Sequence, residues 1–327
     1  MTVAVMLLQY NHMKKLPIIK LSKLRRIKKP NWDYKKLAIK ASILAGILLI
    51  SSGYLAYTKL YLTNDRRFWM AIDNNLSTKS VVQEVSTGGT GNRNVDKTRF
   101  NFGVEATIDK ISSISSKTAT TDSNVGTHTV TTTKGQYVSY LNINTNEKKA
   151  DGSDYNFDSI KGLWAKQPDA TSTEEADNLK LSFIQPHVTL APFGNLSAAT
   201  RRSIVNDLKS SGAYVIDYAN THIQEVDGQK YIAYPVSVKL KKYVSILQKN
   251  FDALGYGTFP PLDASKYAEN SHYSATFFIN PSDNSMHSIE LENQTEVYTN
   301  YGVISKAPVP AEAITLDALQ ERLQKLQ

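Results

Sequence analysis

An apolar stretch near the amino terminus restricts the architecture of this chain more than any other feature. From Leu37 the sequence reads LAIKASILAGILLISSGYLAY, and no charged residue follows Lys40 until after Tyr57. A helix needs roughly 17–25 apolar residues to cross a bilayer, and residues 37–57 reach that length if Lys40 extends its amine to the interface. The stretch therefore predicts a transmembrane helix over residues 37–57.

Basic residues on one side of this stretch indicate its orientation. The first 40 positions hold eleven of the 38 Lys and Arg residues and only one acidic residue, Asp33. Positively charged flanks of a membrane helix remain on the cytoplasmic side. We therefore expect residues 1–36 to form a basic cytoplasmic segment and the carboxy-terminal part to lie outside the cell membrane, held by a single pass.

Two other interpretations of the apolar stretch are a buried core helix and a cleaved signal peptide. A core helix would leave the basic flank without a purpose. A signal peptide has a basic region of only a few residues, and no clean Ala-x-Ala site follows the apolar run here. An uncleaved anchor is favoured, and translation could start at Met1 or at Met13, which opens a basic leader of its own.

Charge and cysteine content exclude several classes of function for the rest of the chain. Beyond position 40 acidic residues slightly outnumber basic ones, so we expect no nucleic-acid partner. The chain has no cysteine, which excludes disulfides, a catalytic thiol, thiolate-bound metal and a lipid-modified cysteine anchor. An exported domain of this size without disulfides favours a bacterial origin.

Hydrophobic periodicity predicts an α+β domain over residues 64–302. Alternating apolar residues predict strands at 80–86, 100–108 and 137–143, and further strands follow at 214–218 and beyond. The Ser- and Thr-rich stretch 112–134 suits a solvated hairpin or a flexible linker, and we favour the hairpin. At least eight strands, many in sequential hairpins, indicate a mostly antiparallel sheet with packed helices.

Local signals place several element ends. Asn64 or Asp65 can cap a first helix, Ser172 or Thr173 another, and Ser197 and Gly212 bracket a third. Asp227-Gly228 is typical of a tight hairpin turn, and Pro235 in the returning strand predicts a sheet edge or a bulge. Residues 303–327 are expected to form a tail with a short helix from Leu316.

No motif for catalysis or cofactor binding is present. The six histidines show no metal-ligand spacing, no Walker loop or nucleophile elbow occurs, and the Gly-rich 88–93 precedes a strand and not a helix. We therefore expect no enzyme, no cofactor and no metal site.

Eighteen tyrosines, several on apolar strand faces, allow two interpretations. They could line a groove for a lipid or peptide, or they could be ordinary sheet core. The groove hypothesis concerns seven residues of the second half: Tyr234, Val236, Val238, Phe251, Tyr273, Phe277 and Ile289.

The order of elements, with the segments DGQKYIAYPVSV and FFINPSDNSMHSIEL, resembles the LolA/LppX-like lipoprotein-carrier superfamily over roughly residues 65–302. That resemblance implies a curved, half-barrel-like sheet capped by helices, with a concavity that binds acyl chains. This chain lacks the anchor cysteine common among surface members, so its membrane helix would substitute.

Two hypotheses for function follow. The first is a membrane-anchored binding module for a lipid or for lipoprotein acyl chains. The second is a structural assembly subunit of a cell-envelope or secretion complex, with an envelope protein as partner. The sequence leaves the oligomeric state open.

Overall fold

The computed structural model describes residues 42–44, 46–47, 50–51, 63–89, 92–102, 111–132, 135–169, 172–256, 262–304 and 309–326. The chain divides into two units, Met1–Leu60 and Tyr61–Gln327, and each is described by itself.

The described residues of the first unit are helical, and they belong to the apolar stretch. The side chains of Ile43, Ile47 and Ile50 are more than half exposed. Across the described part of the chain, no helix combines the length and apolarity that crossing a membrane requires. The basic segment 1–36 and most of the membrane helix expected at 37–57 lie outside the described residues, so both stay predictions.

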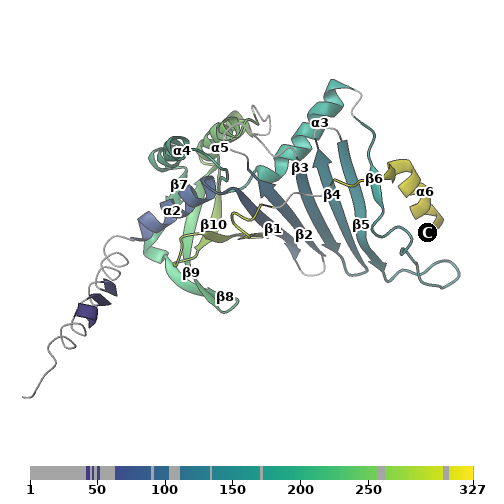
Figure 1. Cartoon of the computed structure of the whole chain (residues 1–327), viewed down its shortest axis with the longest axis horizontal. Coiled ribbons are helices and arrows are strands. Elements are labelled where there is room, and N and C mark those ends of the chain that lie inside the picture. The colour runs from purple at the N-terminus through teal and green to yellow at the C-terminus, as the bar shows by residue number, and fades with distance from the viewer. Residues whose placement is uncertain are drawn as a thin grey trace, which may run out of the picture. The chain divides into compact units, whose positions relative to one another are not determined.

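The second unit is an α+β structure built on one large, curved and open sheet, as the sequence predicts (Figure 1). Its helices are α2 (Asn64–Leu76), α3 (Thr173–Ile184), α4 (Ala198–Ser211), α5 (Leu240–Ala253) and α6 (Leu316–Leu326). Its strands are β1 (Ser80–Gly89), β2 (Asn92–Asn101), β3 (Ile111–Ala119), β4 (Ser123–Thr132), β5 (Gly135–Thr145), β6 (Trp164–Lys166), β7 (Tyr214–Ile216), β8 (His222–Val226), β9 (Gln229–Lys239), β10 (His272–Ile279), β11 (Met286–Leu291), β12 (Gln294–Thr299) and β13 (Ile314–Thr315).

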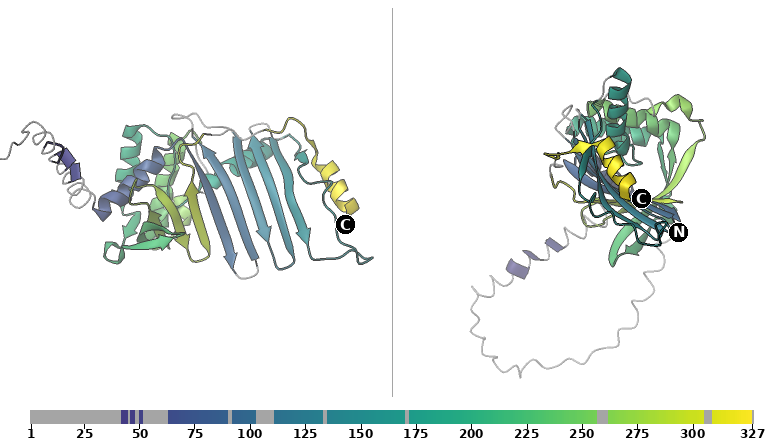
Figure 2. Two further views of the ribbon diagram at one scale, coloured as in Figure 1. Left: turned by 60° about the horizontal axis from the view of Figure 1, so that its bottom comes forward. Right: turned by 90° about the vertical axis from the view of Figure 1, so that its right-hand side faces the viewer.

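The strand order is β13-β6-β5-β4-β3-β2-β1-β12-β11-β10-β9-β7, with β8 also paired to β9. Among the strands named here, every pairing is antiparallel except that of β13 with β6. Sequential hairpins account for most neighbours, but β1 pairs with β12, and this contact joins the two strand groups into one sheet. Figure 2 shows the long strands β1–β5 side by side, with α6 beyond them.

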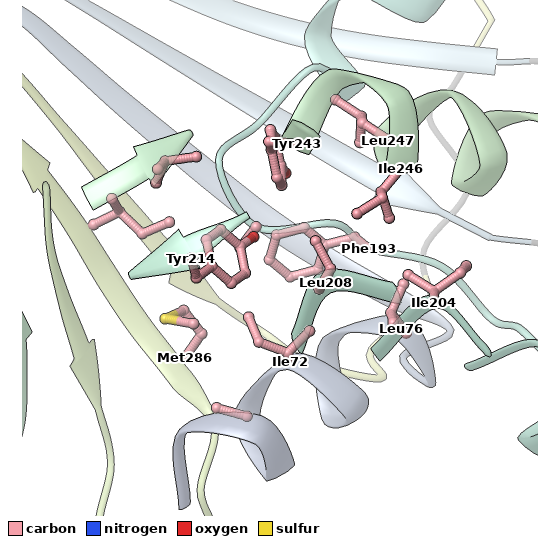
Figure 3. Packing of buried hydrophobic residues seen from close by; sticks show 14 of the residues in the cluster. Ile72, Leu76, Phe193, Ile204, Leu208, Tyr214, Tyr243, Ile246, Leu247 and Met286 are labelled. Atoms are coloured by element: carbon pink, nitrogen blue, oxygen red, sulfur yellow. The ribbon is translucent and has the colours of Figure 1, made fainter. Parts of the chain in front are cut away.

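Helices α2, α4 and α5 cover one face of the sheet where β9, β10 and β11 lie (Figure 1). The side chain of Phe68 on α2 is fully buried, and its ring packs edge-on against Tyr214 and Tyr234 with centroids 5.8 and 5.5 Å apart. Figure 3 shows this cluster from close by, with Ile72 of α2, Leu208 of α4 and Leu247 of α5 among its members. These contacts form the main hydrophobic core.

Helix α2 is also fixed to the sheet by hydrogen bonds. The Arg67 guanidinium donates to the Pro281 carbonyl at 2.7 Å and to the Asn284 Oδ1 at 3.1 Å. Asn74 donates to the carbonyls of Asp283 and Asn284. The turn between β10 and β11 is therefore held by the helix that follows the apolar stretch.

A second core lies at the other end of the sheet, where the chain ends. Leu319 of α6 packs with Phe157, Ile160 and Ala165. The segment 303–327, expected as a tail, thus contributes β13 to the sheet and α6 to a core of the same unit.

Most element ends follow the local signals. Ser172 and Ser197 cap α3 and α4 with their hydroxyl groups, and Gly212 ends α4 in the left-handed conformation. Asp227 and Gly228 both have positive φ angles, as a two-residue hairpin turn requires. The Ser- and Thr-rich stretch forms the predicted hairpin, as β3 and β4.

Four expectations need correction or completion. Helix α2 is capped by Thr63 and not by Asn64 or Asp65, because the Thr63 hydroxyl accepts from the Arg66 amide. The strand from Tyr214 ends at Ile216, because the Asp217 carboxylate accepts two amides of the next turn. The strand predicted at 100–108 begins earlier, at Asn92, and residues 103–110 lie outside the described part of the chain.

The fourth concerns Pro235, which lies in an inner strand and not at an edge or bulge. On one side β9 pairs with β10, and on the other it pairs first with β8 and then with β7. The Pro235 carbonyl accepts from the Asp217 amide at 2.9 Å, in the interval between these two short strands. In a strand, the amide and the carbonyl of one residue point to the same side. The amide that Pro235 lacks would therefore point to the interval between β7 and β8, where no hydrogen bond between paired strands is lost.

Candidate functional site

The structure places six of the seven predicted groove residues in the closed main core. Tyr234, Val236, Val238, Phe251, Phe277 and Ile289 are between 0% and 3% exposed and belong to one packed cluster. The seventh, Tyr273, is 52% exposed. The apolar strand faces are therefore filled by α2, α4 and α5, and Tyr273 marks where the helices stop covering the sheet.

An open groove begins beside Tyr273, with a volume of about 1090 Å³. It lies between α5 and the ends of β10, β11 and β12, and the segment before α4 closes a further side. Ligand sites of small molecules commonly enclose roughly 300–1,000 Å³, so the groove can take a molecule of substantial size.

One wall of this groove, which we call the α5 groove, is apolar. Helix α5 contributes Leu240, Val244 and Leu247 from the side that also packs on the core. Four more apolar residues from other segments also line the groove: Val188, Leu190, Leu262 and Leu291. Such a wall can remove hydrocarbon from water.

Buried tyrosine hydroxyls hold the 188–190 segment in place. Tyr243 on α5 donates to the Thr189 carbonyl at 2.7 Å, and Tyr214 on β7 donates to the Leu190 carbonyl at 2.7 Å. Burial raises the pKa of Tyr243 well above its ordinary value of 10, so its hydroxyl stays neutral and remains a donor. The apolar wall is thus anchored from two elements.

The opposite wall is polar, and its centre is the carboxyl group of Glu296 on β12. Gln294, Glu296 and Tyr298 alternate along β12 and share the face toward the helices, where Tyr298 packs against Phe193. The side chain of Glu296 is 4% exposed, and it still lines the groove.

Three neutral groups donate hydrogen bonds to this carboxyl group. Gln83 Nε2 and the Tyr298 hydroxyl reach Oε2 at 3.1 and 2.5 Å, and Gln294 Nε2 reaches Oε1 at 2.7 Å. Burial raises the pKa of Glu296 above its ordinary value of 4.5, although these donors act in the opposite direction. A buried carboxyl with a raised pKa in a cleft is typical of a functional site.

A second groove of about 880 Å³ lies along β7, β9, β10 and β11. Ser274, Leu291 and Glu292 line both grooves, so the two adjoin at the ends of β10 and β11. The wall of this second groove includes Pro235, Ser237 and Thr276.

Within the described residues, no three His, Cys, Asp or Glu side chains form a group that could hold a metal ion.

Glu296 and the α5 side of the groove were not predicted from the sequence. The run QTEVYT alternates, but both of its faces carry polar residues, so periodicity does not tell which face is buried. The available signal was that Glu296 and Tyr298 lie on the same face of the strand. That this face is buried becomes clear only from the pairing of β12 with β1.

The comparisons with known proteins give a likeness to solved structures and no match by sequence. No family model and no curated protein matches the sequence. Among solved structures, the chain is similar to the crystal structure of LprF from Mycobacterium bovis, with a TM-score of 0.36 and 11% identity over 76% of this chain and 95% of that one. The described residues do form the curved, mostly antiparallel sheet with packed helices that was expected, and membership of the lipoprotein-carrier superfamily stays a prediction.

Proposed function

We propose that this protein is an extracytoplasmic binding module that holds the acyl chain of a lipid or lipoprotein in the α5 groove. The carrying observation is a groove of about 1090 Å³ with an apolar wall from α5 on one side and hydrogen-bonding groups on the other. These two sides match the two parts of an amphiphile, its hydrocarbon chain and its polar head. Of the seven residues predicted for a groove, Tyr273 lines the α5 groove, and the six core residues would support it from beneath without contacting the ligand.

The membrane anchor at 37–57 belongs to the same proposal. It is supported by the uncharged run after Lys40 and by the exposure of Ile43, Ile47 and Ile50, which suits a helix surrounded by lipid. A membrane helix in this stretch would keep the groove-bearing unit attached to the bilayer from which a ligand comes.

Hydrocarbon burial sets the expected affinity. Each methylene removed from water contributes roughly 0.8 kcal/mol, so each added methylene should tighten binding by about fourfold until the groove is full. An eight-carbon chain gives roughly 6 kcal/mol, which the cost of association largely offsets. We therefore expect weak binding of octyl compounds and strong binding of long chains.

Native mass spectrometry of the full chain, extracted gently from membranes, tests this function. We expect a lipid to remain bound to the unmodified protein. Val188→Asp places a charge on the apolar wall and should abolish retention, whereas Ile223→Asp makes the same change at an exposed site on β8 outside the groove. Absence of lipid from the unmodified protein, or equal loss in both variants, would contradict the proposal.

A second candidate function is assembly of an envelope complex. It is supported by strand β8, which pairs on one side with β9 and exposes most of its residues, Ile223 among them at 68%. A strand edge of this kind can pair with another chain. Crosslinking in intact membranes through a reactive group at Ile223 should then recover a partner protein, and recovery of monomer alone would exclude this use of β8.

A further inference from the structure

The charges that line the α5 groove are of one sign. Two carboxyl groups, those of Glu292 and Glu296, belong to its wall, and among the described lining residues there is no lysine or arginine. The lining also includes one histidine, His272. A ligand with an anionic head would therefore meet a negative wall.

Three lysines on α5 point away from the groove. Lys241 pairs with Glu269, Lys249 pairs with Asp207 at 2.8 Å, and Lys242 donates to the Ser211 carbonyl at 2.7 Å. Helix α5 thus brings apolar residues and Tyr243 to the groove and turns these positive charges elsewhere. The orientation of α5 therefore keeps its lysines out of the groove and leaves the carboxyl groups as the charged groups of the lining.

The carboxyl group of Glu296 is bonded only to neutral donors among the described residues. Gln83, Gln294 and Tyr298 satisfy its oxygens without supplying a positive charge. A buried carboxylate without a counter-ion is costly, and a cation that enters the groove relieves that cost. The carboxyl group lies at the groove wall, so a ligand can approach it.

Aromatic residues add to this preference. Tyr243, Tyr267 and Tyr273 all line the groove, and they come from α5, from the segment before β10 and from β10 itself. Aromatic rings attract ammonium groups by roughly 0.5–2 kcal/mol, and several rings together with carboxylates are the usual means of binding quaternary ammonium.

From these observations we propose that the α5 groove selects amphiphiles whose head group is an ammonium, with Glu296, Glu292 and the three groove tyrosines as its receptor. This inference rests on the proposed function, since the hydrocarbon wall supplies the other half of the recognition. The ligand class is a long-chain amine, a quaternary ammonium lipid or a lipid with an amine in its head.

Isothermal titration of the full chain in nanodiscs, corrected with empty nanodiscs, distinguishes the alternatives. The probes share one chain length and differ in charge: decyltrimethylammonium, decyl maltoside and decanoate. We expect the ammonium compound to bind about tenfold tighter than the neutral one, and decanoate to bind weakest. Glu296→Gln and Glu292→Gln should each lower the affinity for the ammonium probe several-fold and leave decyl maltoside unchanged.

Glu290→Gln is the matched control. Glu290 lies near the end of β11, two positions before Glu292, but of the two grooves it lines only the second. Its affinities should equal those of the unmodified protein. Glu292 is exposed, so its variant keeps the test valid if Glu296→Gln fails to fold.

Equal affinity for all three probes, or tightest binding of decanoate, would overturn the selectivity while the binding function stands. Failure of all three probes to bind would overturn both proposals.

Discussion

The contact between α2 and the β10–β11 turn makes a quantitative prediction about stability. Arg67 is 9% exposed, and its guanidinium makes two hydrogen bonds across 214 and 217 positions of sequence, to Pro281 and Asn284. Hydrogen bonds to a charged group contribute roughly 1.5–3 kcal/mol each. Arg67→Ala should therefore destabilise the second unit by about 3–5 kcal/mol.

Since 1 kcal/mol shifts the melting temperature of a domain this large by roughly 2–4 °C, we expect a decrease of about 6–20 °C. Thermal unfolding of the full chain in nanodiscs, followed by near-ultraviolet circular dichroism, measures it. Arg66→Ala is the control, because Arg66 is the neighbouring residue on α2 and is exposed. A variant at Arg67 as stable as the one at Arg66, within about 0.5 kcal/mol, would refute this account of how α2 is fixed.

Two further predictions concern Glu296 and Gly212. Because burial raises the folded-state pKa of Glu296, the protonated form is favoured in the folded protein, and the stability it contributes is present below about pH 4.5 and is lost as the pH rises through the folded-state pKa. Without ligand, Glu296→Gln should therefore become more stable relative to the unmodified protein as the pH increases from 4 to 8. The nearby Tyr243 and Tyr298 hydroxyls stay neutral over this range, because burial raises the pKa of both. Urea titrations at several pH values measure the difference in stability, and a difference that does not change with pH would contradict this prediction. Gly212 has a φ of 65° where α4 ends, so Gly212→Ala should cost about 1 kcal/mol, and an unchanged urea midpoint would show that the strain is absorbed elsewhere.

Local rules predicted the parts of the fold that depend on neighbouring residues. The caps at Ser172 and Ser197, the end of α4 at Gly212 and the turn at Asp227-Gly228 each depend on a few adjacent positions, and all are confirmed. The pairing of β1 with β12 joins positions more than 200 residues apart, and no local signal specifies it.

The same limit explains the site. The groove hypothesis was based on the most apolar strand faces. In a sheet covered by helices, those faces are buried beneath the helices and form the core. A binding surface forms where the covering ends, beside Tyr273, and its polar member Glu296 stands in a strand whose two faces look alike in sequence. Pro235 is a similar case, because its position between β7 and β8 depends on where two other strands stop.

Photo-crosslinking tests the central claim, that the α5 groove holds a hydrocarbon chain, most directly. The full chain in nanodiscs is irradiated with a long-chain amine that carries a diazirine near its methyl end, and the modified peptides are identified by mass spectrometry. We expect the label on peptides that contain Leu190, Val244 or Leu262, and its loss when unlabelled decyltrimethylammonium competes. Labelling confined to peptides outside the groove, or labelling that the competitor does not reduce, would contradict it.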